Sequence, residues 1–184
     1  MGYTFVSGNV ALDLAGTVGH RDGEDRYDLL TGPATLASWV VDAGLVDEAP
    51  PVDEHGLAAT VELREAVFRL ARAQLRGEAG AAADRDVLNA AAAAAPVTVT
   101  LRPGDGDGVA RAGDLDAVRS SIAREAIGLL GGPRSAQLKA CGADPCTRLY
   151  LDLSRRGARR WCDMRECGNR AKAAAYRSRH APTG

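Results

Sequence analysis

Four cysteines limit the folding of this 184-residue chain more than any other feature of its sequence. They are Cys141, Cys146, Cys162 and Cys167, and they form two C-x4-C pairs separated by fifteen residues. Paired cysteines in tight turns can direct four thiolates at one Zn²⁺ ion, which favours a tetrahedron of soft ligands. The first alternative is a redox dithiol, although neither pair has the C-x-x-C spacing, and the second is a set of unrelated buried cysteines.

The residues around the cysteines favour the zinc site. Residues 141–146 read CGADPC, in which the glycine and proline suit a tight turn, and residues 147–154, TRLYLDLS, can form a strand that leaves it. Tyr150, Trp161 and Tyr176 are predicted to pack around the metal. A region as small as residues 133–184 buries little apolar surface, so one structural Zn²⁺ would supply the missing folding energy. Four thiolates leave no open coordination position, so the metal is not expected to activate water.

The charge of the chain divides near the same place. Residues 1–132 contain 11 arginines, no lysine and 20 acidic residues, a net charge of −9. Residues 133–184 contain 12 basic and 4 acidic residues, a net charge of +8. Two glycines and a proline at residues 131–133 suit a boundary. We therefore predict an acidic domain over residues 1–132 and a small basic domain over residues 133–184.

Hydrophobic spacing predicts that the acidic domain is mostly helical. Helices are expected at residues 8–19, 33–44, 55–77, 81–96 and 114–132, the last with Asp114 as its N-cap. Residues 97–103 alternate like a strand and are expected to pair with residues 108–113 across the turn GDGDG. This turn lacks the glycine that a calcium loop needs at its sixth position. The expected fold is mainly α (α+β): a helical N-terminal domain with a small β-hairpin, followed by a treble-clef-like zinc finger.

The segment CGNRAKAAAYRSRH, which begins at Cys167, is predicted to form a basic helix. Arginine on a rigid, metal-anchored element suits phosphate contact and the reading of guanine in the major groove of DNA. The candidate DNA-binding residues are four on this helix and four upstream of it: Asn169, Arg170, Lys172, Arg177, Arg155, Arg156, Arg159 and Arg160. The alternative is a solvated basic surface, or one that engages RNA, a protein or the acidic domain itself.

A second candidate site lies in the acidic domain. Asn9, Asp13 and Thr17 form one polar row of the first expected helix. Arg64 interrupts the apolar face of the third between Val61 and Phe68. A buried arginine needs an anion, and the pattern makes Asp13 the nearest candidate. One interpretation is a structural Asp13–Arg64 salt bridge. The other is a cavity in which Asn9, Asp13 and Arg64 bind a small polar or anionic effector.

Two parts of the chain resemble known bacterial families. Cys167-Gly168-Asn169-Arg170 is the signature of the CGNR zinc finger, which residues 139–179 resemble along their whole length. The N-terminal segments FVSGNVALDLAGTV, LLTGPATLASWVVDAGLV and LREAVFRL are similar to the ABATE domain that precedes this finger in bacterial proteins. The resemblance implies a stress-induced transcription regulator whose finger binds DNA.

The remaining features narrow the class of protein. The N-terminus lacks a basic n-region and Asp13 interrupts its early apolar stretch, so we expect no signal peptide, no membrane span and a cytoplasmic location. No Ser/His/Asp or Cys/His pattern indicates catalysis, so an enzyme is not expected. A small-molecule-binding protein or enzyme built on Asn9, Asp13 and Arg64 is the remaining alternative. A single finger reads few base pairs, so we expect a homodimer if operator binding is tight.

Overall fold

A computed structural model describes residues 2–102 and 108–180 of the chain, and four of the five residues of the GDGDG turn lie outside these ranges. The elements in chain order are α1 (Val10–Ala15), β1 (Val18–Gly19), β2 (Tyr27–Asp28), α2 (Pro33–Asp42), α3 (Glu54–Leu75), α4 (Ala82–Ala92), β3 (Thr98–Leu101), β4 (Val109–Ala112), α5 (Leu115–Leu130), the 3-10 turn η1 (Pro133–Gln137), β5 (Leu138–Ala140), β6 (Leu149–Leu151), the π-helical turn η2 (Met164–Gly168) and α6 (Asn169–Arg179). All five helices predicted for the N-terminal part are present, so the mainly helical fold is confirmed. The first helix is shorter than predicted, because the chain turns into β1 after Ala15.

Side chains cap the helices at the ends where the sequence offers them. Asp114 accepts a hydrogen bond from the N–H of Ala117 at 2.8 Å, which confirms the predicted N-cap of α5. Asn9 does the same for α1 by accepting from the N–H of Ala11 at 3.0 Å. Both caps satisfy backbone donors that a helix leaves unpaired in its first turn.

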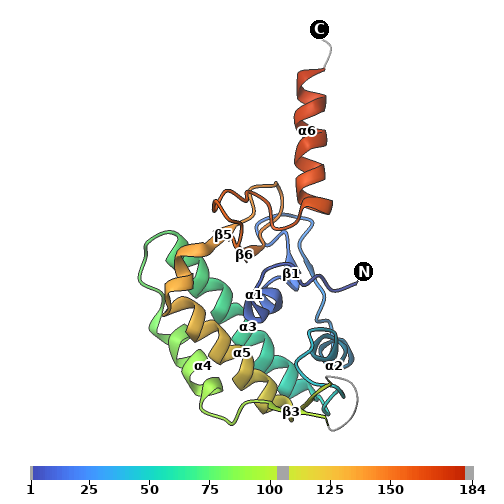
Figure 1. The fold of residues 1–184 in the computed structure, drawn as a ribbon, viewed down its shortest axis with the longest axis vertical. Helices are drawn as coiled ribbons and strands as arrows, with labels where there is room; N and C mark the ends of the chain where they lie inside the picture. The colour runs from blue at the N-terminus through green and yellow to red at the C-terminus, as the bar shows by residue number, and fades with distance from the viewer. Residues whose placement is uncertain (1, 103–107, 181–184) are drawn as a thin grey trace.

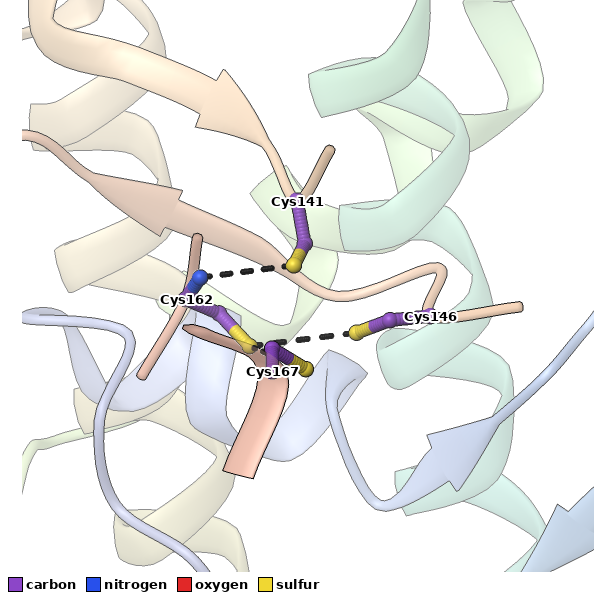
Figure 2. Close-up of side chains that lie close together, drawn as sticks. All are labelled: Cys141, Cys146, Cys162 and Cys167. Atoms are coloured by element: carbon purple, nitrogen blue, oxygen red, sulfur yellow. Dashed lines mark hydrogen bonds between the residues drawn. The ribbon is translucent and has the colours of Figure 1, made fainter. Parts of the chain in front are cut away.

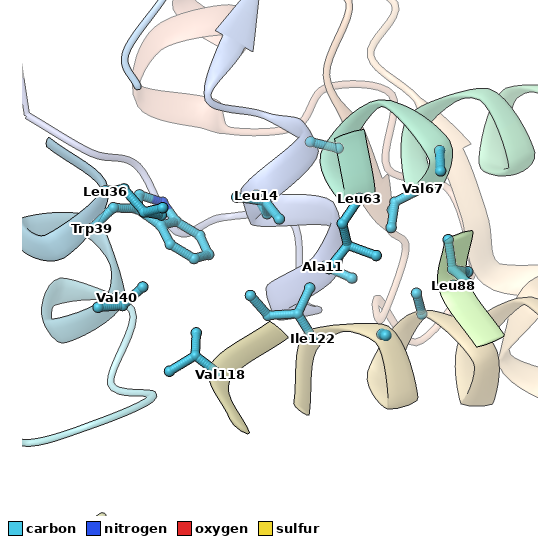
Figure 3. Packing of buried hydrophobic residues seen from close by; sticks show 14 of the residues in the cluster. Ala11, Leu14, Leu36, Trp39, Val40, Leu63, Val67, Leu88, Val118 and Ile122 are labelled. Atoms are coloured by element: carbon cyan, nitrogen blue, oxygen red, sulfur yellow. The ribbon is translucent and has the colours of Figure 1, made fainter. Parts of the chain in front are cut away.

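The main hydrophobic core lies between α3 and the helices that pack on it, α1, α2, α4 and α5 (Figure 3). Its largest member is the fully buried Trp39, and almost all the others are aliphatic. The buried face of α3 runs through Leu63, Val67 and Leu70, whereas Val61 and Phe68 are only half-buried. The buried face of α3 is therefore rotated about the helix axis relative to the predicted apolar face, and it includes Arg64.

Among the described residues, three two-stranded antiparallel sheets complete the fold. The pairing of β3 with β4, in which Thr98 lies opposite Ala112, confirms the predicted hairpin. The pairing of β1 with β2, with Val18 opposite Asp28, was not predicted. The pairing of β5 with β6 places Leu138 opposite Leu151 and carries the first cysteine pair.

The finger region, defined here as residues 133–180, shares a second hydrophobic core with the helices. This core contains residues from α1, α3, α5 and the β5–β6 hairpin: Leu12, Ala71, Leu129, Leu138, Leu149 and Leu151. The N–H of Leu151 also donates to the carbonyl of Ser7 at 2.8 Å, so the hairpin is joined to the N-terminal segment through its backbone. The β5–β6 hairpin is thus part of the body of the molecule.

The helix α6 projects away from that body at one end of the molecule (Figure 1). Its packing on other elements is concentrated at η2, which leads directly into its first turn. Within the described ranges, no helix has the length and the apolar character that crossing a lipid bilayer requires.

Candidate metal centre and basic helix

The four predicted cysteine ligands converge on one point (Figure 2). Their sulfur atoms all lie within 4.8 Å of one another. The Sγ of Cys162 lies 3.8 Å from that of Cys146 and 3.6 Å from that of Cys167. Sulfurs bound at about 2.3 Å to a tetrahedral Zn²⁺ are separated by about 3.8 Å, whereas a disulfide requires about 2.05 Å. All four cysteines are free, and their geometry fits one structural Zn²⁺.

Backbone hydrogen bonds hold the first cysteine pair in place. Cys141 follows β5, and its N–H donates to the carbonyl of Arg148 at 2.9 Å across the hairpin. The N–H of Cys146 donates to the carbonyl of Ala143 at 2.7 Å and closes the turn. Gly142 is bonded to the carbonyl of Arg160 at 2.9 Å, which connects this turn to the loop before the second pair.

The second pair comes from a loop and from the turn η2. The N–H of Cys162 donates to the Sγ of Cys141 at 3.4 Å, and Cys167 lies inside η2, one residue before the glycine that precedes α6. Tyr150 and Trp161 pack beside the cluster as predicted. Tyr176 does not, because 58% of it is exposed on α6. The cluster is therefore enclosed by the hairpin and the loop, and α6 emerges from it.

The close approach of the sulfurs shifts the pKa of the first two cysteines in opposite directions. A hydrogen bond from Cys146 lowers the pKa of Cys141 far below its usual value. The same bond, together with burial, raises the pKa of Cys146 to about 12. Four thiolates at this separation repel one another unless a positive ion lies between them, and Zn²⁺ binds cysteine in its deprotonated form.

Two of the predicted DNA-binding arginines are used inside the finger region. The guanidinium of Arg159 donates to the carbonyls of Trp161, at 2.8 Å, and of Cys162, and it lies over the ring of Tyr150 at 4.6 Å. It therefore holds the loop that carries the second cysteine pair. Arg170 donates from its NH2 group to the Sγ of Cys167 at 3.1 Å.

The contact of Arg170 with Cys167 connects the basic helix to the metal centre. Burial alone would lower the pKa of Arg170, but the negative charge of Cys167 and its neighbours raises it. A hydrogen bond from an arginine to a metal-binding thiolate orients the ligand and offsets its charge. Arg170 thus connects the first turn of α6 to the cysteine cluster.

The other predicted contact residues lie on the surface. Arg155, Arg156 and Arg160 are exposed in the loop between β6 and Cys162, and Arg160 lies 5.6 Å from the ring of Trp161. Lys172 and Arg177 are exposed on α6. Asn169 is also exposed and donates to the carbonyl of Arg165 at 2.9 Å. No ion pair involves these basic side chains among the residues that the structure describes.

The predicted Asp13–Arg64 salt bridge is wrong. Arg64 makes a bidentate contact with Asp28, at 2.8 Å for both hydrogen bonds, and donates further bonds to Glu65 at 2.9 Å and to the hydroxyl of Thr17 at 3.2 Å. Asp13 instead accepts from the N–H of Ser7 at 2.9 Å. The sequence pattern missed Asp28 because the residue reaches Arg64 only through the unpredicted pairing of β2 with β1.

Each of the three residues predicted to bind an effector interacts with other residues of the protein. The side chain of Asn9 caps α1 and donates to Glu125 at 3.1 Å. Burial raises the pKa of Asp13, and its closest cation is Arg148 of the finger region at 3.8 Å. Asp13 therefore contributes to the junction between α1 and the finger region, and a role of Asn9, Asp13 and Arg64 in effector binding stays a prediction.

Comparison with known protein families gives two matches that together span most of the chain. Residues 8–133 match the ABATE family, described as "Putative stress-induced transcription regulator". Residues 137–180 match the CGNR zinc finger, and this segment contains all four cysteines. No curated protein matches the chain.

Proposed function

Since the chain belongs to the ABATE family, whose description is "Putative stress-induced transcription regulator", and carries a CGNR zinc finger, we propose that it regulates transcription by binding duplex DNA through α6. The observation that carries this proposal is the placement of α6, whose first turn is anchored at the cysteine cluster while the rest projects from the body (Figure 1). The proposed role is that of a regulator and not of an enzyme. We propose a cytoplasmic location, because four free cysteines suit a reducing compartment.

The arrangement of side chains on α6 supports this proposal. Asn169, Ala173 and Tyr176 follow one another at spacings of four and three residues, so they share one face of the helix. Arg177 borders this face on one side and Lys172 on the other. We propose that the central face approaches the base edges and that the two basic residues contact phosphates.

The dimensions and the charge of the finger region agree with this assignment. The major groove is about 12 Å wide and admits one α-helix. The 11 residues of α6 span about 16 Å, enough to cross the groove. Arg155 and Arg156, exposed in the loop beside the cysteine cluster, would add contacts to the DNA backbone. A single helix of this length reads few base pairs, so we propose that the protein binds a two-fold operator as a homodimer.

The test is fluorescence anisotropy of the zinc-loaded full chain with mixed-sequence duplex DNA at increasing salt. Each neutralised phosphate contributes roughly 0.9 to the slope of log affinity against log salt concentration. The double variant Lys172→Ala, Arg177→Ala should weaken binding and reduce this slope by roughly 2. The matched control, Arg76→Ala with Arg85→Ala, removes the same charge from two exposed positions, the C-cap of α3 and the surface of α4, and should leave the slope unchanged.

Two results would count against the proposal. Absence of binding at low salt would mean that the basic surface serves a protein partner or the acidic part of the chain. Equal binding of duplex DNA and duplex RNA would point to a phosphate-binding surface without groove preference, because the major groove of A-form RNA is too narrow for a helix.

A further inference from the structure

A cavity of about 310 Å³ lies between the β1–β2 hairpin and the finger region. Its walls include His20, Tyr27 and Leu29 from the helical side and Thr147, Arg148 and Arg170 from the finger side. Sites for small molecules begin at about 300 Å³ and combine apolar walls with a few convergent polar groups. This cavity has that composition, and it adjoins the first turn of α6.

Hydrogen bonds fix the side chain of Arg148 at the cavity wall and leave some of its N–H donors unused. Its guanidinium donates to the carbonyls of Thr4 at 3.0 Å and Gly16 at 3.1 Å, and only 12% of the side chain is exposed. The nearest carboxylate, that of Asp13, lies at 3.8 Å, beyond hydrogen-bond distance. A guanidinium has five N–H donors, so this partly buried cation has hydrogen-bonding capacity left for a ligand.

Two hydroxyl groups add to the donors of the cavity. The oxygen of Thr147 accepts from the N–H of Arg21 at 3.2 Å, which leaves its own O–H free to donate. None of the hydrogen bonds among the described residues uses the hydroxyl of Tyr27. With Arg148 and Arg170, the cavity therefore presents four donor side chains, together with the carboxylate of Glu166 and the sulfurs of three metal-centre cysteines, Cys146, Cys162 and Cys167.

The backbone around the cavity is shaped to hold these groups. A Cβ atom at residue 19 would collide with the ring of Tyr27, so glycine is required there for that ring to line the cavity. His20 has a φ of 48°, which residues other than glycine rarely adopt, and is held by Asp25 at 2.7 Å. Strained backbone that the surrounding structure maintains is concentrated at functional sites.

We propose that this cavity binds a small aromatic monocarboxylate, with its carboxylate held by Arg148, Arg170 and the hydroxyl of Tyr27 and its ring against Val18 and Leu29. The donor-rich wall favours a ligand that only accepts hydrogen bonds. A dianion such as phosphate is disfavoured, because Glu166 and the cysteine sulfurs also line the cavity. The binding site is independent of the proposed function. The predicted effect of the ligand on DNA binding does rest on the proposed function. A carboxylate that binds Arg170 would compete with the Sγ of Cys167 for this guanidinium, and so would change the contact that anchors the first turn of α6.

The experiment is calorimetric titration of the zinc-loaded full chain, without DNA, with benzoate, benzamide and inorganic phosphate. Benzoate should bind saturably, and benzamide and phosphate at least about tenfold more weakly. The variant Tyr27→Phe should weaken benzoate binding by about tenfold, the typical effect of losing one hydrogen bond to a charged group. The control Tyr3→Phe, which removes a hydroxyl bonded to the carbonyl of Thr35 outside the cavity, should not change it.

Absence of saturable benzoate binding would overturn the proposal, as would tighter binding of phosphate or equal affinities of the wild type and Tyr27→Phe. Because the titration contains no DNA, such a failure would leave the proposed function untouched. Coupling to α6 predicts in addition that benzoate changes the affinity for DNA, and that DNA changes the affinity for benzoate by the same factor.

Discussion

The substitution Leu151→Ala tests whether the finger region and the helices unfold as one unit. Leu151 is fully buried in the shared core, where it packs with Leu12 of α1 and Leu129 of α5. Removing three buried carbons at roughly 0.8 kcal/mol each destabilises the fold by about 2.4 kcal/mol. The cavity left behind adds about 1 kcal/mol, so we expect a total loss of about 3 kcal/mol.

The two tryptophans of the chain make the assay selective. Trp39 is buried in α2, and Trp161 packs beside the cysteine cluster, so each reports on one part of the molecule. Urea unfolding of zinc-loaded single-tryptophan variants, Trp39→Phe and Trp161→Phe, follows each part separately by fluorescence. Because the core is shared, Leu151→Ala should shift both transitions together and lower the melting temperature by about 6–12 °C.

The control is Leu153→Ala, which truncates a leucine that is 60% exposed and should change stability by less than about 0.5 kcal/mol. The reasoning would be refuted if Leu151→Ala shifted only the Trp161 transition and left that of Trp39 in place. Such a result would mean that the two parts unfold as independent domains.

Three further predictions concern the metal and the charges around it. Removal of Zn²⁺ by a chelator should unfold the finger region and, through the shared core, lower the melting temperature of the helices as well, since structural zinc contributes about 10 kcal/mol or more in small fingers; circular dichroism should then show the loss of α6. Arg170→Ala should speed the transfer of zinc to a chromogenic chelator by about tenfold or more, whereas Arg177→Ala, an exposed arginine on the same helix, should not. Burial alone would raise the pKa of Glu65, but hydrogen bonds and charge from Arg21 and Arg64 lower it below its usual value of 4.5. The ionised carboxylate therefore stabilises the fold above pH 4.5, and this contribution decreases as the pH falls below that value. Wild type should exceed Glu65→Gln in unfolding free energy by about 1–3 kcal/mol at neutral pH, and urea titrations should find this difference shrinking in acid.

Local features of the sequence predicted the elements that depend on local chemistry. The five helices, the N-cap at Asp114 and the β3–β4 hairpin follow from capping residues, periodicity and turn composition. The four cysteines were recognised as one metal site because their spacing and residue types alone restrict the coordination geometry.

Contacts between distant segments could not be predicted in this way. The counter-ion of Arg64 is Asp28, 36 residues away, and only the pairing of β1 with β2 brings it near. Helical spacing likewise could not identify the buried face of α3, because Arg64 belongs to that face through its ion pairs. The use of Arg159 inside the finger region depends on the fold of a loop, for which the sequence contains no periodic signal.

Because α6 is anchored at its first turn and projects from the body, a small rotation at that turn displaces its far end by a larger distance. Anchored at one end, its 11 residues place the far end about 16 Å from the pivot at η2. A tilt of about 10° at the pivot would displace that end by about 3 Å, close to the 3.4 Å rise of one base pair. A small rearrangement of the side chains at the root would therefore move the tip by almost one step along a duplex, without any change in the helical body.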